Sequence, residues 1–219
     1  MNLFGPIDLQ RAIQMIIILL ISIDVHELAH AIAADRLGDS TPRRLGEISL
    51  NPFTHMDQVG IVLLLLTSIS SYGFTYGRTH VTPSNLKYGP QRGHAIVAVV
   101  GPLSNLVLAA IATVVLRFHL SDSANINDQM TNFLWLAIQL NVLLFMFNLL
   151  PIPPLDGFTI VGGFLTARQL YQIAPLQQWG PLLILLLFIT EPNTHFIANI
   201  TNPVFNQIVP WVCTNCAVV

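Results

Sequence analysis

The segment IDVHELAHAIA, Ile23–Ala33, decides how this chain must fold, because it places four ionisable side chains inside a long apolar run. They are Asp24, His26, Glu27 and His30. Residues 12–23, which precede this cluster, contain no charged side chain at all. An ionisable group in hydrocarbon costs about 2.5–3.5 kcal/mol on insertion scales, so four of them require a partner that compensates for the cost. The segment therefore predicts a membrane helix that carries a polar functional site.

Composition indicates that the whole chain belongs in a membrane. Hydrophobic residues make up 53% of its 219 residues and charged residues only 9%, whereas a soluble domain has about 25% charged residues. The formal net charge is −2 and the signs are scattered, so no basic patch suggests a nucleic-acid partner. We therefore expect an integral, multi-pass membrane protein with a single domain that covers residues 1–219.

Long intervals without Asp, Glu, Lys or Arg locate the expected membrane helices, because a spanning helix needs about 20 apolar residues. Besides the first helix, at about 7–34, the qualifying intervals are Gln58–Gly77, Gly93–Leu116, Gln129–Leu155 and Gln169–Thr190. A last apolar stretch, 196–211, is broken by Pro203 and Pro210, which favours a packed or interfacial segment. We expect an all-α polytopic membrane protein with about four to six transmembrane helices.

The basic residues predict the topology of these helices. Six of the nine Lys and Arg residues lie between Arg36 and Arg92, in the two connections that flank Gln58–Gly77. The positive-inside rule places both connections in the cytoplasm only if this interval enters the membrane and returns, although a true crossing stays open. We therefore expect a re-entrant or short β segment near the active site. An exposed strand edge within 47–81 could receive a substrate segment by strand addition.

The spacing of His26 and His30 is that of two metal ligands on one helix. Residues four apart share a face, with Cβ atoms about 5–6 Å apart, so both imidazoles can bind one ion. Glu27 lies close enough to act on a metal-bound water without being a ligand, which is the chemistry of the H-E-x-x-H pattern. The alternative is a buried polar cluster that neighbouring helices satisfy. It is disfavoured, because two histidines and two acids are an expensive way to fill a membrane core.

A third ligand is expected from elsewhere, because catalytic zinc usually has three protein ligands and an open position. Asp156 is the candidate, in FNLLPIPPLDGF, where prolines interrupt a long uncharged run and break the membrane helix. The alternative is that Pro-x-Asp-Gly marks only a surface turn. In that case Asp57 or His55 would be the next candidate ligand.

Four motifs in order resemble the site-2 proteases, in their short bacterial and archaeal form without PDZ or CBS domains. The motifs are HELAH (26–30), NPFTHMD (51–57), GPLSN (101–105) and NLLPIPPLDG (148–157). The resemblance implies an intramembrane zinc metalloprotease that hydrolyses peptide bonds within or near transmembrane segments of membrane proteins. It also implies a catalytic core at about 7–170, followed by a C-terminal helix and tail at 171–219.

The resemblance also implies roles for individual residues. One Zn²⁺ per chain would be bound by His26, His30 and Asp156, with Glu27 as the catalytic acid and base. Asn148, eight residues before the ligand aspartate, would contact substrate or the oxyanion. His55, in NPFTHMD, is also a candidate for a substrate or oxyanion role near the metal, although structural hydrogen bonding is the favoured interpretation.

The resemblance further predicts the surroundings of the enzyme. Its partners would be a membrane-protein substrate and the lipid bilayer. Its location would be the plasma membrane of a prokaryote, with the active site towards the cytoplasm. Two other functions stay open: a membrane transporter, or a non-catalytic membrane binding module with a metal site. Neither needs a glutamate between two ligand histidines.

Other polar residues receive simpler interpretations. Asn105 and Asn141 are expected to bridge helices, and Asp24 points away from the other three ionisable groups. Cys213 and Cys216 form a lone C-x-x-C, which fits a disulfide, half of a metal site or two inert thiols. The remaining histidines are expected at membrane boundaries: His80, His94, His119 and His195.

Overall fold

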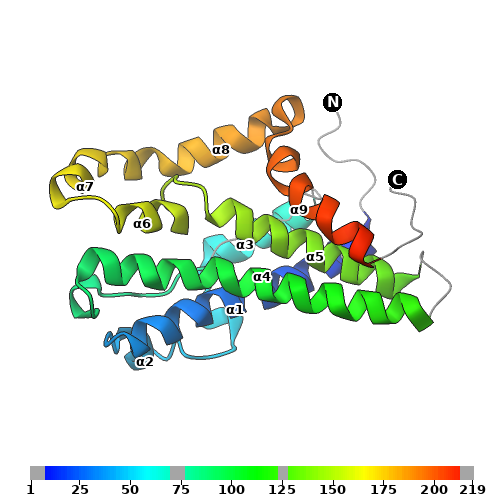
Figure 1. The fold of residues 1–219 in the computed structure, drawn as a ribbon, viewed down its shortest axis with the longest axis horizontal. Helices are drawn as coiled ribbons and strands as arrows, with labels where there is room; N and C mark the ends of the chain where they lie inside the picture. The colour runs from blue at the N-terminus through cyan, green and yellow to red at the C-terminus, as the bar shows by residue number, and fades with distance from the viewer. Residues whose placement is uncertain (1–7, 70–76, 123–127, 213–219) are drawn as a thin grey trace.

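The structure, a computed structural model, describes residues 8–69, 77–122 and 128–212. The described residues form helices and no strand, which confirms the all-α fold class (Figure 1). The α-helices are α1 (Leu9–Arg36), α2 (Thr41–Arg44), α3 (Gln58–Ile69), α4 (Pro90–Asp122), α5 (Gln129–Asn148), α6 (Asp156–Gly162), α7 (Ala167–Ile173), α8 (Leu176–Thr194) and α9 (Phe196–Val212). Two 3₁₀ turns cover Pro52–Thr54 and Pro83–Asn85.

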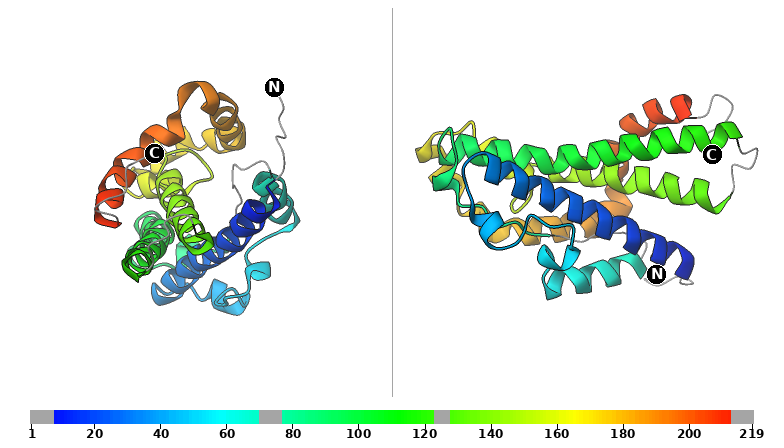
Figure 2. Two further views of the ribbon diagram at one scale, coloured as in Figure 1. Left: turned by 90° about the vertical axis from the view of Figure 1, so that its right-hand side faces the viewer. Right: turned by 90° about the horizontal axis from the view of Figure 1, so that it is seen from below.

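Helices α1, α4 and α5 form the centre of the molecule, and α4 packs against both of the others (Figures 1 and 2). Among the described residues, these three are long and apolar enough to cross a membrane. Four to six such helices were expected from the sequence. The count among the described residues is lower because α3 is described only to Ile69, and because the interval Gln169–Thr190 is divided between α7 and α8, whose apolar stretch is Leu176–Leu187.

Two buried clusters hold the bundle together. One joins α1, α3 and α5 through side chains such as Met15, Leu19 and Leu64. The other joins α4 and α5, and there α9 covers Ile138 and Val142 with Val204, Phe205, Ile208 and its buried Val212. The packed position of α9 agrees with the interpretation of the proline-broken stretch 196–211.

The two ends of the interval Gln58–Gly77 meet. The Arg78 backbone N–H donates to the His55 carbonyl at 2.8 Å, so the chain leaves and returns at one level. Because these two ends meet, the re-entrant interpretation is the one that fits the described residues.

Two buried carboxylates keep both connections at the same end of the molecule. Asp39 accepts from the Thr82 N–H at 2.6 Å, and Glu47 accepts from the His80 N–H at 2.9 Å. Both carboxyl-bearing residues are almost completely buried. Burial opposes ionisation of Asp39, but hydrogen bonds from Thr41, Thr82 and Asn85 outweigh it and hold its pKa below the usual value.

The same contacts explain why the expected short strand is not found among the described residues. Residues 77–82 have no regular secondary structure. The N–H groups of His80 and Thr82 are satisfied by the side chains of Glu47 and Asp39 instead of by a neighbouring strand. The intervening residues 70–76 lie outside the described ranges.

The proline-rich break after α5 turns the chain back into the bundle. Helix α5 ends at Asn148 and α6 begins at Asp156, as the broken-helix prediction requires. A Cβ atom on Gly157 would lie 2.2 Å from the Leu149 carbonyl oxygen, so α6 approaches the end of α5 as closely as only glycine permits. Gly180 of α8 packs in the same way on Pro153, where a Cβ would lie 2.0 Å from the carbonyl oxygen.

The topology predicts which positions face the same side of a membrane. Single cysteines at Ser40 and Ser84 should react with an impermeant thiol reagent from one side, and a cysteine at Ser121 from the other, in a background with Cys213 and Cys216 replaced by serine. All three serines are exposed. Labelling of sealed membrane vesicles of known orientation measures this. Opposite labelling of positions 40 and 84 would contradict the re-entrant topology.

Candidate metal centre

Helix α1 carries the first half of the centre. Its buried residues include His26, Glu27 and His30, each less than one tenth exposed. The two imidazoles lie one helical turn apart and meet at right angles, with ring centroids 4.7 Å apart. Their Nε2 atoms are 3.1 Å from each other. The helical spacing predicted this convergence, and the structure contains it.

Asp156, the first residue of α6, completes the centre from 126 positions beyond His30. Its Oδ2 lies 3.1 Å from His26 Nε2, and its Oδ1 lies 3.3 Å from His30 Nε2. The ligand-capable atoms of the three residues are all within 4.8 Å of one another. Within the described ranges, this is the group of histidine and acidic residues that could bind a metal ion.

Helix α4 sets the orientation of both imidazoles. His30 Nδ1 donates to the Val97 carbonyl oxygen at 2.8 Å, and His26 Nδ1 donates to Asn105 Oδ1 at 3.1 Å. Because a carbonyl oxygen can only accept, each Nδ1 carries a proton, so the Nε2 of each ring offers its lone pair when the ring is neutral. Asn105 bridges helices, as expected, but its partner is a predicted metal ligand, and sequence reasoning missed that.

Gly101 allows α4 to approach the two rings. A Cβ atom at this position would lie 2.3 Å from His30 Nε2 and 2.7 Å from His26 Nε2. No side chain fits there without moving an imidazole. Gly101 and Asn105 both belong to the GPLSN motif, so the motif was the available signal, although its spacing alone assigned neither residue to the centre.

The chemistry of these groups fits a metal ion. Two imidazole lone pairs and a carboxylate converge in a buried space, and none of these three acceptors supplies a proton to the others. Such an arrangement of acceptors is repulsive unless a cation lies between them. Two histidines with one carboxylate form a ligand set that catalytic zinc sites use.

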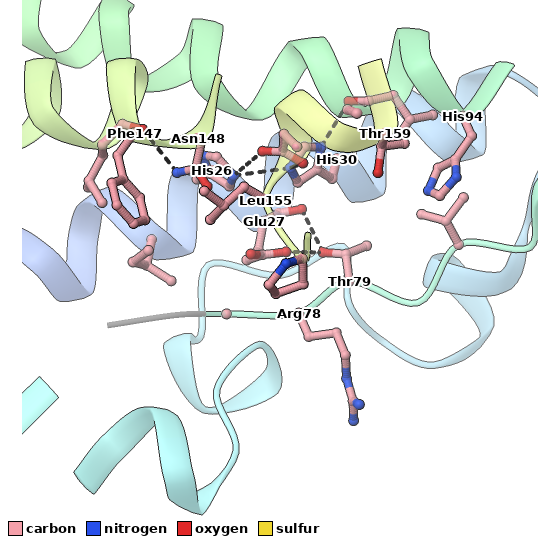
Figure 3. A pocket seen from close by; sticks show the side chains of 18 residues that line it. His26, Glu27, His30, Arg78, Thr79, His94, Phe147, Asn148, Leu155 and Thr159 are labelled. Atoms are coloured by element: carbon pink, nitrogen blue, oxygen red, sulfur yellow. Dashed lines mark hydrogen bonds and ion pairs between the residues drawn. The ribbon is translucent and has the colours of Figure 1, made fainter. Parts of the chain in front are cut away.

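Glu27 lies beside the three-residue group and has its own partners. Thr79 Oγ1 is 2.8 Å from Glu27 Oε2 and 3.0 Å from the Glu27 backbone oxygen. Gly77 packs on the same side chain, since a Cβ there would lie 2.6 Å from Glu27 Cγ. The segment that follows the re-entrant interval therefore covers Glu27 (Figure 3).

A cavity of about 410 Å³ opens onto the centre. Its wall includes the four centre residues His26, Glu27, His30 and Asp156, with apolar side chains such as Ile23, Leu144 and Phe147. Asn148 also lines the cavity, and its Nδ2 donates to the Leu144 carbonyl at 3.0 Å. His94, expected at a membrane boundary, lines the cavity beside Thr159, away from Phe147 and Asn148 (Figure 3).

His55 lies elsewhere. It is buried, and its Nε2 is 3.2 Å from the Ser49 carbonyl oxygen and 3.8 Å from Asp24 Oδ1. It is not among the residues that line the cavity. Asp57 accepts from the Gly60 N–H at 2.9 Å, at the start of α3. His55 and Asp57, the alternative candidates for the third ligand, therefore do not belong to the group that could bind a metal ion.

Two other histidines pair with acids away from the centre. His80 bonds to Glu47. His119 lies 2.7 Å from Asp128, whose pKa is lowered to about 2, chiefly by hydrogen bonds from Thr131. Cys213 and Cys216 lie outside the described residues.

A buried group of two histidines and one carboxylate, with a glutamate beside it and membrane-length helices around it, is the arrangement that an intramembrane metallopeptidase requires. The profile of Peptidase family M50 matches residues 118–187, a range that includes Asp156. The protein named "Putative zinc metalloprotease YwhC" from Bacillus subtilis (strain 168) is 32% identical over 201 residues, which is 89% of this chain and 88% of that protein. The chain belongs to peptidase family M50, the site-2 protease family of intramembrane zinc metalloproteases.

Two further relatives are both named "Putative zinc metalloprotease Rip2". The protein from Mycolicibacterium smegmatis is 32% identical over 174 residues, which is 78% of this chain and 64% of the relative. The one from Mycobacterium tuberculosis (strain H37Rv) is 27% identical over 177 residues, again 78% and 64%. The chain thus spans just under two thirds of the Rip2 proteins. No solved structure matches the chain significantly.

The close approach of α4 to the two imidazoles predicts that a methyl group added at Gly101 will disturb metal binding. Gly101→Ala should displace an imidazole and weaken zinc binding by about 10–100-fold, the usual effect of disturbing the groups that orient metal ligands. Gly162→Ala is the matched control, because its Cβ would meet only a Leu170 methyl at 3.4 Å. Zinc titration of the purified proteins measures both. Wild-type affinity in Gly101→Ala would contradict the geometry.

Proposed function

We propose that this chain is an HExxH-type zinc endopeptidase that cleaves membrane proteins within or near a transmembrane segment. The observation that carries the proposal is the convergence of His26, His30 and Asp156 beside Glu27, inside an apolar helical bundle. One zinc ion per chain would be bound by the three converging residues. The whole chain, 1–219, would act as one membrane-embedded peptidase domain.

The bound zinc would polarise the scissile carbonyl and lower the pKa of a water molecule. Glu27 supplies the proton transfers. Its carboxylate, buried and next in sequence to His26, accepts a proton from the attacking water and returns it to the leaving amine. Both transfers occur at one side chain, so the net reaction adds one water across the peptide bond.

Asn148 is the candidate donor to the substrate. It lines the cavity on the same side as Phe147, at the end of α5. Its Nδ2 now bonds the Leu144 carbonyl of its own helix, and it carries a second N–H that is available to a substrate oxygen. His55 supports the site from a distance, because its carbonyl oxygen holds the chain where the re-entrant interval returns.

The cavity favours an unwound segment of substrate. A helix keeps its carbonyl oxygens in bonds to the N–H four residues later, so attack requires local unwinding. The cavity wall offers apolar side chains from α1, α4 and α5 beside the polar centre. A transmembrane segment that unwinds within this wall keeps apolar side chains out of water while one carbonyl reaches the centre.

The distribution of charge supports a cytoplasmic opening in the plasma membrane of a prokaryote. Helices α2 and α7 and the start of α4 lie at one end of the bundle (Figure 1). These parts carry Arg43, Arg44, Arg92 and Arg168. Basic residues concentrate on the cytoplasmic side of membrane proteins. No specific observation favours a transporter or a binding module, because neither function requires a glutamate at the position of Glu27.

The assignment of Glu27 to proton transfer predicts a separation of metal binding from catalysis. Glu27→Gln should retain one zinc per chain and lose at least 100-fold in peptidase rate, because general acid–base catalysis contributes about 10²–10⁴-fold. Asp156→Ala should lose zinc as well as activity. The measurements are metal analysis and cleavage of a quenched reporter with one transmembrane helix of about 20 residues.

Asp128→Ala is the control for the loss of a carboxylate, because Asp128 caps α5 far from the centre. It should retain both zinc and activity. Full turnover by Glu27→Gln would rule out the proposed mechanism, and full zinc in Asp156→Ala would move the third ligand elsewhere.

A further inference from the structure

Residues 77–82, here called the strap, are held against the bundle at alternate positions. The backbone N–H groups of Arg78, His80 and Thr82 donate to the His55 carbonyl, Glu47 and Asp39, at 2.8, 2.9 and 2.6 Å. Gly77, Thr79 and Val81, which alternate with these anchors, line the cavity, and so does Arg78. The strap is therefore a fixed part of the cavity wall.

Thr79 places a hydroxyl on Glu27. Its Oγ1 is 2.8 Å from Glu27 Oε2, within the range of a hydrogen bond to an ionised acceptor. A hydroxyl has a single proton to donate. Thr79 Oγ1 also lies 3.0 Å from the Glu27 backbone carbonyl oxygen. The carboxylate and the backbone of Glu27 are therefore both in contact with the Thr79 hydroxyl. In Figure 3 the two side chains point toward each other.

Gly77 confines the other carboxylate oxygen. A Cβ atom there would lie 2.9 Å from Glu27 Oε1 and 2.6 Å from its Cγ, so the bare glycine backbone packs directly on the side chain. Within the described residues, the side-chain hydrogen bond to the Glu27 carboxylate comes from the strap, and both of its oxygens meet the strap. The strap thus sets the direction in which the carboxylate faces.

We propose that Thr79 is a positioning residue that orients the Glu27 carboxylate for proton transfer. The proposal rests on the acid–base role of Glu27 proposed above. A glutamate side chain has several rotatable bonds, and only part of its range faces the metal-binding group. The Thr79 hydroxyl selects one direction before substrate binds, so its loss should slow the chemical step rather than weaken substrate binding.

The test compares two substitutions at one position. Thr79→Val keeps the shape and removes the hydroxyl, whereas Thr79→Ser keeps the hydroxyl. With the transmembrane reporter, Thr79→Val should lower kcat about 10–100-fold, with KM within about twofold and one zinc per chain. Thr79→Ser should stay within about threefold of the wild-type kcat.

Thr82→Val is the matched control from the same strap. Its Oγ1 pairs with Thr41 Oγ1 at 3.0 Å and does not contact Glu27. This variant should keep the wild-type kcat, which would exclude a general effect of removing a strap hydroxyl.

Four results would overturn the inference. They are a wild-type kcat in Thr79→Val, a raised KM with unchanged kcat, loss of zinc from Thr79→Val, and a serine variant as slow as the valine variant. Each of them assigns Thr79 no role or a role other than orienting Glu27. Failure of the proposed function would differ, because Glu27→Gln itself would then turn over the reporter at the wild-type rate.

Discussion

The structure depends on the mutual approach of three acceptor groups that would repel one another without a cation. His26, His30 and Asp156 bring two lone pairs and a carboxylate to within 3.3 Å of each other in an apolar bundle. The surrounding elements can be understood as the means of holding them there. Helix α4 supplies an acceptor for each Nδ1 and a glycine where a side chain would collide, and the break after α5 returns Asp156 to the centre.

Two polar side chains outside the centre meet a related requirement, because an unpaired polar group inside a membrane protein costs free energy. Asp39 and Glu47 are buried, and each satisfies backbone N–H groups of a segment without regular secondary structure. They fix the returning chain beside α1. This arrangement gives the re-entrant interval a rigid base and gives the cavity one wall that is not a membrane helix.

The sequence predicted the parts of this site that obey a local rule. Helical periodicity placed His26 and His30 on one face, and the prolines before Asp156 marked the break that carries the proposed third ligand. Among the described residues, three of the expected four to six membrane helices are long and apolar enough to span, because the absence of charge does not show where a helix stops. Asn105, Gly101 and Thr79 were missed as parts of the site. They reach it from 52 to 79 positions away, and only packing of α4 and the strap on α1 creates those contacts.

The central claim is that one zinc ion lies between α1 and α6, bound by two imidazoles and one carboxylate. X-ray absorption at the zinc edge of the purified, zinc-loaded protein tests it most directly, because the nearest shell reports the ligand atoms and imidazole rings add characteristic outer shells. The account predicts nitrogen and oxygen neighbours at about 2.0–2.2 Å, two imidazoles and no sulfur. A sulfur neighbour at about 2.3 Å, which only Cys213, Cys216 or a methionine could supply, or fewer than two imidazoles, would contradict it.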